Sequence, residues 1–206
     1  MDVFKDRLRG IAVGAVAGDA LGMPLEFQPA RAIYDLQTEM VDGPLPAGTF
    51  TDDTEMALAL AESLLAHDPL NAEDLITRFM DWYHGNPSDI GIHTSRVLGM
   101  IDSGTPWQEA AQLVQEMDPE NASNGSLMRA WPLAIARWQQ PERLAAESRE
   151  QSMLTHAHPD CVSACVLINH ILYELVHRPA EIPPDQAMRE AVSAASMALT
   201  PNDRPS

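Results

Sequence analysis

Apolar residues recur at helical spacing along most of the chain. After Thr51, an apolar stripe of the kind found in amphipathic helices is formed by Ala57, Leu60, Ala61, Leu64 and Leu65. This predicts a helix to about His67, and similar patterns predict helices over residues 2–22, 71–84, 93–103, 107–117, 141–154, 161–177 and 185–199. No stretch alternates apolar and polar residues as a half-buried strand would. The sequence therefore predicts an all-α fold.

A long loop is expected between the first two predicted helices. Prolines and glycines recur through residues 23–50, and we expect one short helix over residues 30–36. Loops of this length in a compact domain usually carry function. Glu26 lies in this loop between apolar neighbours. It is either a surface glutamate or a carboxylate beside a pocket.

Four glycines fall at every fourth position of the first predicted helix, namely Gly10, Gly14, Gly18 and Gly22. A glycine costs a helix about 1 kcal/mol relative to alanine, so four on one face need a reason. We expect either a second helix packed backbone to backbone or a ligand on this face. Asp19 sits beside the stripe, where a carboxylate needs hydrogen-bond donors.

The second predicted helix opens with the run Thr51-Asp52-Asp53-Thr54. Thr51 or Asp52 is a plausible N-cap, and Asp52 with Glu55 fits an acidic variant of the capping box. Carboxylates in a first turn are also stabilised by the helix dipole. One cap leaves the second aspartate and the threonine hydroxyls as spare hard oxygens, which Mg²⁺ or Ca²⁺ prefers. Both interpretations stand on this run alone.

Two further polar segments lie downstream. Asp89 precedes a predicted helix and is either a cap or a site residue. The small polar loop over residues 121–126 leads to Arg129. Backbone N–H groups of a Gly/Ser loop at a helix start can bind an anion, and Arg129 would help. An ordinary loop is the alternative.

His156, His158, Cys161 and Cys165 raise the alternative of a zinc site. Their spacing fits no standard zinc finger, and the two cysteines lie inside an apolar helix. We therefore expect buried thiols and a hydrogen-bonded histidine instead. The cysteines are four residues apart on one helix face, so they cannot easily pair with each other.

Size and charge narrow the class of protein. The 206 residues suit one domain with a sizeable core. A net charge of −17 argues against nucleic-acid or anionic-membrane binding through a broad basic surface. The N-terminus mixes charges and is not typical of a signal peptide, and no segment is expected to cross a bilayer. With only two cysteines, these features favour a cytoplasmic protein.

The motifs occur in an informative order: Gly18-Asp19-Ala20-Leu21-Gly22, Pro24-Leu25-Glu26-Phe27, Thr51-Asp52-Asp53-Thr54, Asp89-Ile90-Gly91, Asn124-Gly125-Ser126-Leu127-Met128-Arg129 and Thr155-His156. This set resembles the ADP-ribosylglycohydrolase family, which includes the enzyme that reactivates dinitrogenase reductase. The resemblance implies an all-α fold with a central cleft that holds two Mg²⁺ ions, or Mn²⁺ in some members. It also implies removal of ADP-ribose from a modified side chain or a related acceptor.

The resemblance also assigns roles to particular residues. Metal ligands would be Thr51, Asp52 and Asp53. Asp89 and Glu26 look like the carboxylates proposed as the catalytic base in different members. The ADP-ribose cleft would be lined by Asp19, Gly91, Ser123, Asn124, Gly125, Ser126, Met128, Arg129 and His156.

One part of the family pattern is missing. The family carries a second metal half-site, a Gly-Asp-x-Asp-Thr run near the C-terminus, but the only aspartates after Asp160 are Asp185 and Asp203, and neither lies in such a run. We expect a single, C-terminally shortened domain over residues 1–206, either a fragment or a natural short form. Its exposed apolar surface would favour homo-oligomers.

Two functions follow from this pattern. The first is a divalent-metal-dependent hydrolase that cleaves the glycosidic bond of ADP-ribose. The alternative is a non-catalytic ADP-ribose-binding protein or a structural, crystallin-like relative. The sequence leaves open whether this chain is itself an enzyme.

Overall fold

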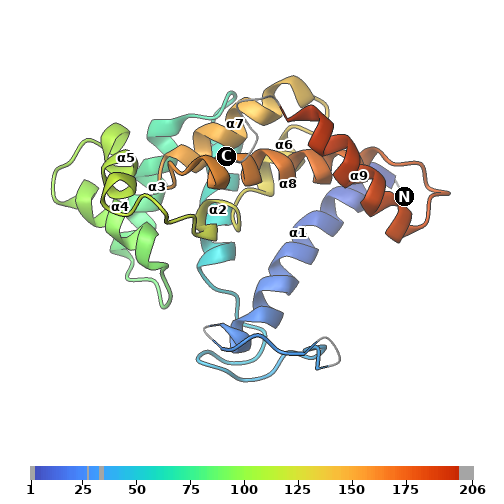
Figure 1. Cartoon of the computed structure of the whole chain (residues 1–206), viewed down its shortest axis with the longest axis horizontal. Coiled ribbons are helices and arrows are strands. Elements are labelled where there is room, and N and C mark those ends of the chain that lie inside the picture. The colour runs from blue at the N-terminus through green and yellow to red at the C-terminus, as the bar shows by residue number, and fades with distance from the viewer. Residues whose placement is uncertain (1–2, 27, 33–34, 200–206) are drawn as a thin grey trace.

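The computed structural model describes residues 3–26, 28–32 and 35–199, and this part of the chain is helical and contains no strand (Figure 1). The elements in chain order are α1 (Val3–Gly22), η1 (Met23–Leu25), α2 (Asp52–Ala66), α3 (Ala72–His84), α4 (Ile92–Asp102), α5 (Trp107–Met117), η2 (Asn124–Ser126), α6 (Pro132–Ala136), α7 (Pro141–Met153), α8 (Pro159–His177) and α9 (Pro184–Ala198). The all-α prediction is confirmed.

Most predicted helices end within two residues of their observed limits. Asn71 caps α3 as expected, since its side chain accepts hydrogen bonds from the backbone N–H groups of Glu73 and Asp74 at 3.0 and 3.1 Å. The helices that the pattern misses are short: η1, η2 and α6. Elements of three to five residues span at most one and a half turns, too few to show a period of 3.6.

The prediction of a short helix over residues 30–36 is wrong for the described residues of that stretch. Ala30, Arg31, Ala32, Asp35 and Leu36 are not helical, and Ile33 and Tyr34 lie outside the described residues. The Asp35 N–H donates to Ala32 O at 2.8 Å. Isolated helices this short are marginal without tertiary packing, because nucleation is costly.

The core is built where α2, α3, α4, α6 and α7 meet. Its fully buried side chains include Met56, Leu60, Leu75, Phe79, Leu98, Leu133 and Leu144. Helix α8 packs against α7 and α9 and also touches α1 and α6, so it is central as its apolar composition predicts. This framework holds the first turns of α2 and α4 and the loop before α6 near one another.

The buried face of α2 differs from the stripe read from the sequence. Ala57 and Leu60 are fully buried as expected, but Leu65 is 88% exposed and Met56 is fully buried instead. Ser63 is also fully buried. The core therefore contacts a face shifted toward Met56 and Ser63, and the hydrophobic period alone could not show this, because both faces carry apolar residues.

The glycine face of α1 is uncovered in this structure. An added Cβ at Gly10, Gly14, Gly18 or Gly22 would meet nothing within 4 Å. The expected close packing of a second helix is therefore not observed. Gly18 and Gly22 line the cavity described below, and Gly10 and Gly14 border a second groove of about 340 Å³ shared with α8. Ala20 is the one α1 residue with a buried side chain in the described chain.

Among the described residues, two helices are long and apolar enough to cross a membrane by length and composition alone, in contrast to the sequence-based expectation. They are Val3–Leu25 and Pro159–His177. Core helices of soluble proteins pass the same test, so this is weak evidence for a membrane span. α8 packs against four other helices, and α1 carries Asp19, whose carboxylate is bonded to α2.

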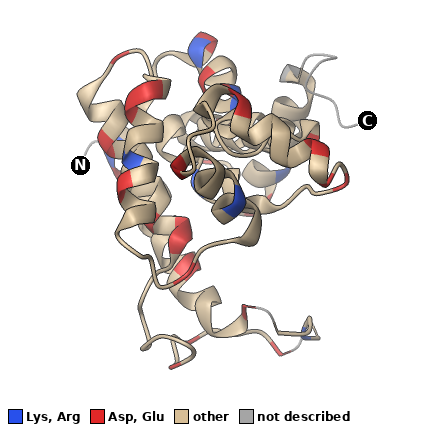
Figure 2. Cartoon of the chain, turned by 90° about the vertical axis from the view of Figure 1, so that its left-hand side faces the viewer, with Lys and Arg blue, Asp and Glu red and all other residues tan. Residues whose placement is uncertain are grey.

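Acidic positions are spread over several helices and outnumber the basic ones (Figure 2). One buried ion pair joins the end of α6 to α7, where Arg137 Nε donates to a Glu147 carboxylate oxygen at 2.8 Å. Arg143 pairs with the same carboxylate at 2.7 Å. Most of the other described acidic side chains are exposed to solvent, apart from a cluster in the cavity described below.

We predict that Gly14→Ala stabilises the protein by about 0.5–1 kcal/mol, because alanine is the better helix former and the new methyl group has free space. Chemical denaturation monitored by circular dichroism measures this. Gly125→Ala is the contrasting control, since its Cβ would lie 2.7 Å from His156 Cε1. A destabilised Gly14→Ala would show that another helix covers this face in solution.

Candidate functional site

The first turn of α2 is held by a carboxylate from α1. The carboxylate of Asp19 accepts hydrogen bonds from the Thr51 N–H at 3.0–3.1 Å and the Thr51 hydroxyl at 2.8 Å. It also accepts from the N–H and the hydroxyl of Thr54, at 3.1 and 2.5 Å. Asp19 thus does from a distance what an N-cap side chain normally does, and its negative charge meets the positive end of the α2 dipole.

The local caps proposed for this turn are not formed. Thr51 occupies the N-cap position of α2, but its side chain makes no capping hydrogen bond and points to Asp19. Glu55 does not close a capping box, because its carboxylate accepts from Trp82 Nε1–H at 2.6 Å. Asp89 is not the cap of α4 either, since Gly91 holds that position. Asp52 and Asp89 therefore have no capping role that would account for them.

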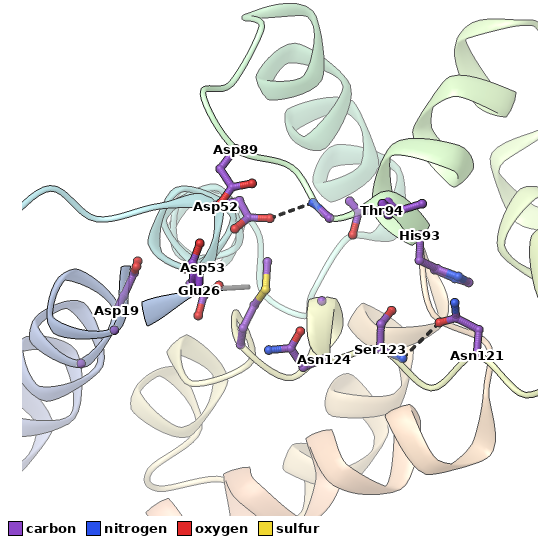
Figure 3. A pocket seen from close by; sticks show the side chains of 16 residues that line it. Asp19, Glu26, Asp52, Asp53, Asp89, His93, Thr94, Asn121, Ser123 and Asn124 are labelled. Atoms are coloured by element: carbon purple, nitrogen blue, oxygen red, sulfur yellow. Dashed lines mark hydrogen bonds between the residues drawn. The ribbon is translucent and has the colours of Figure 1, made fainter. Parts of the chain in front are cut away.

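A cavity of about 620 Å³ lies between these helix ends and the loop before α6 (Figure 3). This volume is within the range of small-molecule sites in proteins. Its acidic lining comes from four segments, with Asp19 on α1, Glu26 after η1, Asp52 and Asp53 on α2, and Asp89 before α4. Residues far apart in the sequence thus converge as the family resemblance implies.

The carboxylates in the cavity raise one another's proton affinity. Burial raises the pKa of Glu26 to about 7, helped by a hydrogen bond with Asp89 and by the charges of Asp89, Asp53 and Asp52. Burial and the charges of Asp19, Asp52 and Asp89 raise the pKa of Asp53 to about 6. The pKa of Asp52 is also raised by burial and by Asp89, although the Gly91 N–H at 3.2 Å opposes this. The cluster would be stabilised by protons or by a cation.

The opposite wall is the loop formed by residues 121–128, which is neutral. Its cavity-lining members are Asn121, Ser123, Asn124, Gly125 and Met128. Gln115 on α5 holds the start of the loop, because its side-chain amide donates to the carbonyls of Asp118, Pro119 and Asn121 at 3.0–3.2 Å. A Cβ at Gly125 would come within 2.9 Å of Thr94 Oγ1 and closer still to His156. Only glycine lets the backbone lie there.

Four residues expected at the site do not line the cavity. Thr51 is 1% exposed and faces Asp19, and Ser126 is fully buried against α7, where it receives the Ser152 hydroxyl at 2.8 Å. Arg129 is also fully buried, and His156 is 1% exposed. Direct contact between these side chains and a ligand does not fit their positions. Asp19, Gly91, Ser123, Asn124, Gly125 and Met128 do line the cavity.

Arg129 is a buried cation held by neutral groups. Its guanidinium donates to Gln151 Oε1 at 3.2 Å, to Gln151 O at 2.9 Å and to Thr155 Oγ1 at 2.8 Å. It also lies 4.3 Å above the centre of the Phe79 ring. Burial lowers the pKa of Arg129 to about 9, so it remains charged at neutral pH. Gln151, which accepts from Arg129, in turn donates to Ser126 O at 3.1 Å and so links this residue to the 121–128 loop.

The proposed zinc ligands have other roles, as the sequence favours. His158 caps α8 by accepting from the Asp160 N–H at 3.2 Å. Cys161 and Cys165 are free and buried, and their thiols contact Ser123 O and Ser126 Oγ at 3.2 and 3.4 Å. Within the described residues, no group of three or more His, Cys, Asp or Glu side chains is placed to hold a metal ion.

Sequence reasoning missed several residues of the cavity wall. Ile92, His93 and Thr94 come from the first turn of α4, and Asn121 begins the loop. The first three follow Asp89-Ile90-Gly91 directly, so their neighbourhood was visible in the sequence. Their orientation depends on how α4 packs, which a motif cannot show.

Comparisons with known proteins agree with this arrangement. The family model described as ADP-ribosylglycohydrolase matches residues 1–203. The ADP-ribosylarginine hydrolase Tri1 of Serratia proteamaculans is 34% identical over 84% of this chain and 48% of its own. The ADP-ribosyl-[dinitrogen reductase] glycohydrolase of Rhodospirillum rubrum is 33% identical over 83% of this chain and 58% of its own.

A solved structure titled ADP-ribosylglycohydrolase-related protein complex superposes with a TM-score of 0.73 and 31% identity, covering 96% of this chain and 62% of that one. The chain thus spans about half the length of the curated relatives it matches. The match of nearly all of its residues to one family model, together with the converging motif residues, leads to one conclusion. This chain belongs to the ADP-ribosylglycohydrolase family.

Proposed function

We propose that this chain binds an ADP-ribosylated molecule in the cavity between α2 and the 121–128 loop and hydrolyses its glycosidic bond to release ADP-ribose. The observation that supports this most directly is the pairing of a carboxylate wall with a neutral amide and hydroxyl wall across about 620 Å³. The relatives' names add the acceptor, because one is a hydrolase of ADP-ribosylarginine and another acts on ADP-ribosyl-[dinitrogen reductase]. ADP-ribosylarginine is therefore the substrate to test first.

The proposed chemistry needs a base and a stabilised cationic transition state. Cleavage of a glycosidic bond passes through an oxocarbenium-like state, which nearby carboxylates stabilise. Glu26 and Asp89 share a hydrogen bond, and the pKa of Glu26 is raised to about 7 by burial and its acidic neighbours. A carboxylate with such a pKa can accept a proton from the attacking water at neutral pH. We propose this pair as the general base.

We further propose that the acidic wall holds a divalent cation, Mg²⁺ or Mn²⁺. Carboxylate oxygens are the ligands these ions prefer, and Asp52 and Asp53 offer them at one end of the cavity. When bound, the ion would orient ribose hydroxyls and lower the pKa of a coordinated water. Because the described residues present no preformed group of three ligands, side-chain movement, bound water or further ligands would have to complete the shell.

The second candidate is a protein that binds ADP-ribose without hydrolysing a bond. The absence of a preformed metal-binding group within the described residues favours it. A structural, crystallin-like role is the remaining alternative, in which neither binding nor release occurs. Measuring ADP-ribose binding and ADP-ribose release on the same preparation separates all three.

The release assay is the decisive test of catalysis. With Mg²⁺ or Mn²⁺, we expect the chain to free ADP-ribose from ADP-ribosylarginine, and we expect Glu26→Gln to lower the rate about 10²- to 10⁴-fold, as loss of a general base does. Asp81→Asn, an exposed carboxylate on α3, is the matched control and should leave the rate unchanged. Binding of ADP-ribose with no release in either metal would reject the hydrolase and support the second candidate.

Cation binding has a readout that does not need activity. We expect Mg²⁺ or Mn²⁺ to raise the melting temperature of the wild type and to have less effect on Asp53→Asn, because that change removes one proposed ligand. The rise should be larger at pH 8 than at pH 5.5, since protons compete for carboxylates whose pKa values are near 6 and 7. Equal shifts in the two proteins would argue against a cation at Asp53.

The pH dependence of stability tests the carboxylate cluster in the presence of a chelator. Folded Glu26 keeps its proton up to about pH 7, whereas the unfolded chain releases it near 4.5. Between these values the folded state binds more protons, so rising pH lowers the free energy of unfolding. Glu26→Gln cannot titrate. We expect the stability of Glu26→Gln relative to wild type to increase from pH 5 to pH 8.

Urea denaturation at several pH values measures this difference. Burial lowers the pKa of His93 and His156, which gives a pH slope of opposite sign, but this slope is common to both proteins and cancels in the comparison. A constant difference between wild type and Glu26→Gln would mean that Glu26 titrates normally.

A further inference from the structure

Behind the 121–128 loop, a chain of hydrogen bonds runs from the buried Arg129 to Ser123 at the cavity. Arg129 Nη2 lies 2.8 Å from Thr155 Oγ1, which lies 2.8 Å from His156 Nδ1. On the other side of the imidazole, Nε2 lies 3.2 Å from Ser123 Oγ. Arg129, Thr155 and His156 are at most 1% exposed, whereas Ser123 is exposed and lines the cavity.

The direction of these hydrogen bonds is set at the buried end. A guanidinium has only donors, so Thr155 Oγ1 must accept from Arg129. The hydroxyl proton of Thr155 then needs an acceptor. Within the described residues, that acceptor is His156 Nδ1. A buried hydroxyl without an acceptor would be costly, so Nδ1 of His156 is the unprotonated ring nitrogen.

His156 carries a single ring proton. Burial, with the charge of Arg129 as the next cause, lowers its pKa to about 2, so the imidazole is neutral at any physiological pH. With Nδ1 accepting, the proton is on Nε2 and is donated to Ser123 Oγ. The ring of His93 is tilted by 37° to that of His156, with the two centroids 4.6 Å apart, so positive charge on both rings would be unfavourable.

With these donors and acceptors assigned, the hydroxyl proton of Ser123 is the one left to be donated. Ser123 Oγ accepts from His156, and no acceptor for the Ser123 hydroxyl proton is found in the part of the chain that the structure describes. Figure 3 shows Ser123 on the loop side of the cavity, opposite the carboxylate group of Asp52 and Asp53. Loop and ring stay in contact because Gly125 has no side chain.

We infer that Arg129, acting through Thr155 and His156, orients the Ser123 hydroxyl as a hydrogen-bond donor to an acceptor oxygen of the ligand. This rests on the proposed function, since the ligand is taken to be ADP-ribose or its conjugate, whose phosphate and hydroxyl oxygens accept such bonds. Arg129, Thr155 and His156 are positioning residues, and Ser123 is the one that touches the ligand. The buried arginine thus influences binding without reaching the cavity.

The first experiment determines the tautomer of His156 in the ligand-free chain of 206 residues. Long-range ¹H–¹⁵N correlation spectra distinguish the protonated ring nitrogen from the unprotonated one, and His156→Gln assigns the signals. We expect the Nε2–H form, and we expect Thr155→Val to change it. A proton on Nδ1 of the wild-type ring would overturn the inference, whatever the protein binds.

The second experiment measures ADP-ribose binding by titration calorimetry. Ser123→Ala should weaken binding about 10- to 100-fold, the usual effect of losing a hydrogen bond to a charged group. Thr155→Val should weaken binding in the wild type but have no further effect in the Ser123→Ala background. Ser163→Ala is the matched control, because this buried hydroxyl bonds only within its own helix, to Pro159 O at 2.7 Å.

The outcomes distinguish a failure of the proposed function from a failure of the inference about Ser123. If the wild type does not bind ADP-ribose, the proposed function fails, while an Nε2–H tautomer would still support the relay. If the wild type binds and Thr155→Val weakens binding equally with and without Ser123, the effect does not pass through Ser123 and the inference is wrong. Melting temperatures identify a variant that is simply unfolded, and the tautomer measurement is independent of that risk.

Discussion

The carboxylate of Asp19 meets four donor groups of the first turn of α2, the N–H and hydroxyl groups of Thr51 and Thr54. Without it, backbone N–H groups at the start of a buried helix would lose their partners, at about 1–3 kcal/mol for each unsatisfied group. The same contact fixes α1, which otherwise has little buried surface, against the body of the protein. The position of Asp52 and Asp53 at the cavity depends on it.

The two walls of the cavity are stabilised in different ways. The acidic wall brings together carboxylates that repel one another. Burial and this repulsion together raise the pKa values of Glu26 and Asp53. The neutral wall is a loop that includes η2, and buried side chains of α7 hold it from behind. Gln151 donates to the Ser126 carbonyl, and Ser152 donates to the Ser126 hydroxyl. Unfavourable charge density is thus concentrated at helix ends, whereas the loop is neutral and its buried end is hydrogen-bonded to α7.

Much of the fold was predictable from the sequence, because long amphipathic helices have a clear period and caps such as Asn71 mark their starts. The convergence of Asp19, Asp52 and Asp89 was implied by the family resemblance that their motifs carry. What could not be predicted was the direction in which side chains point. Arg129 looked like an anion-binding residue because it follows a polar loop, yet it is fully buried against the Phe79 ring. Only the tertiary packing determines this position. Thr51 and Glu55 looked like local caps, but partners distant in sequence outcompeted them.

Gly125 contributes only main-chain atoms to the neutral wall of the cavity. Any side chain at this position would collide with His156 and Thr94, so substitutions of Gly125 cannot change the shape of this part of the wall without disturbing its neighbours. Variation among relatives, or deliberate redesign of ligand preference, would have to use the neighbours that do present side chains, such as Asn121, Ser123 and Asn124. Gly125 is therefore the sterically constrained position of the loop, and its neighbours are the positions at which side chains can be changed.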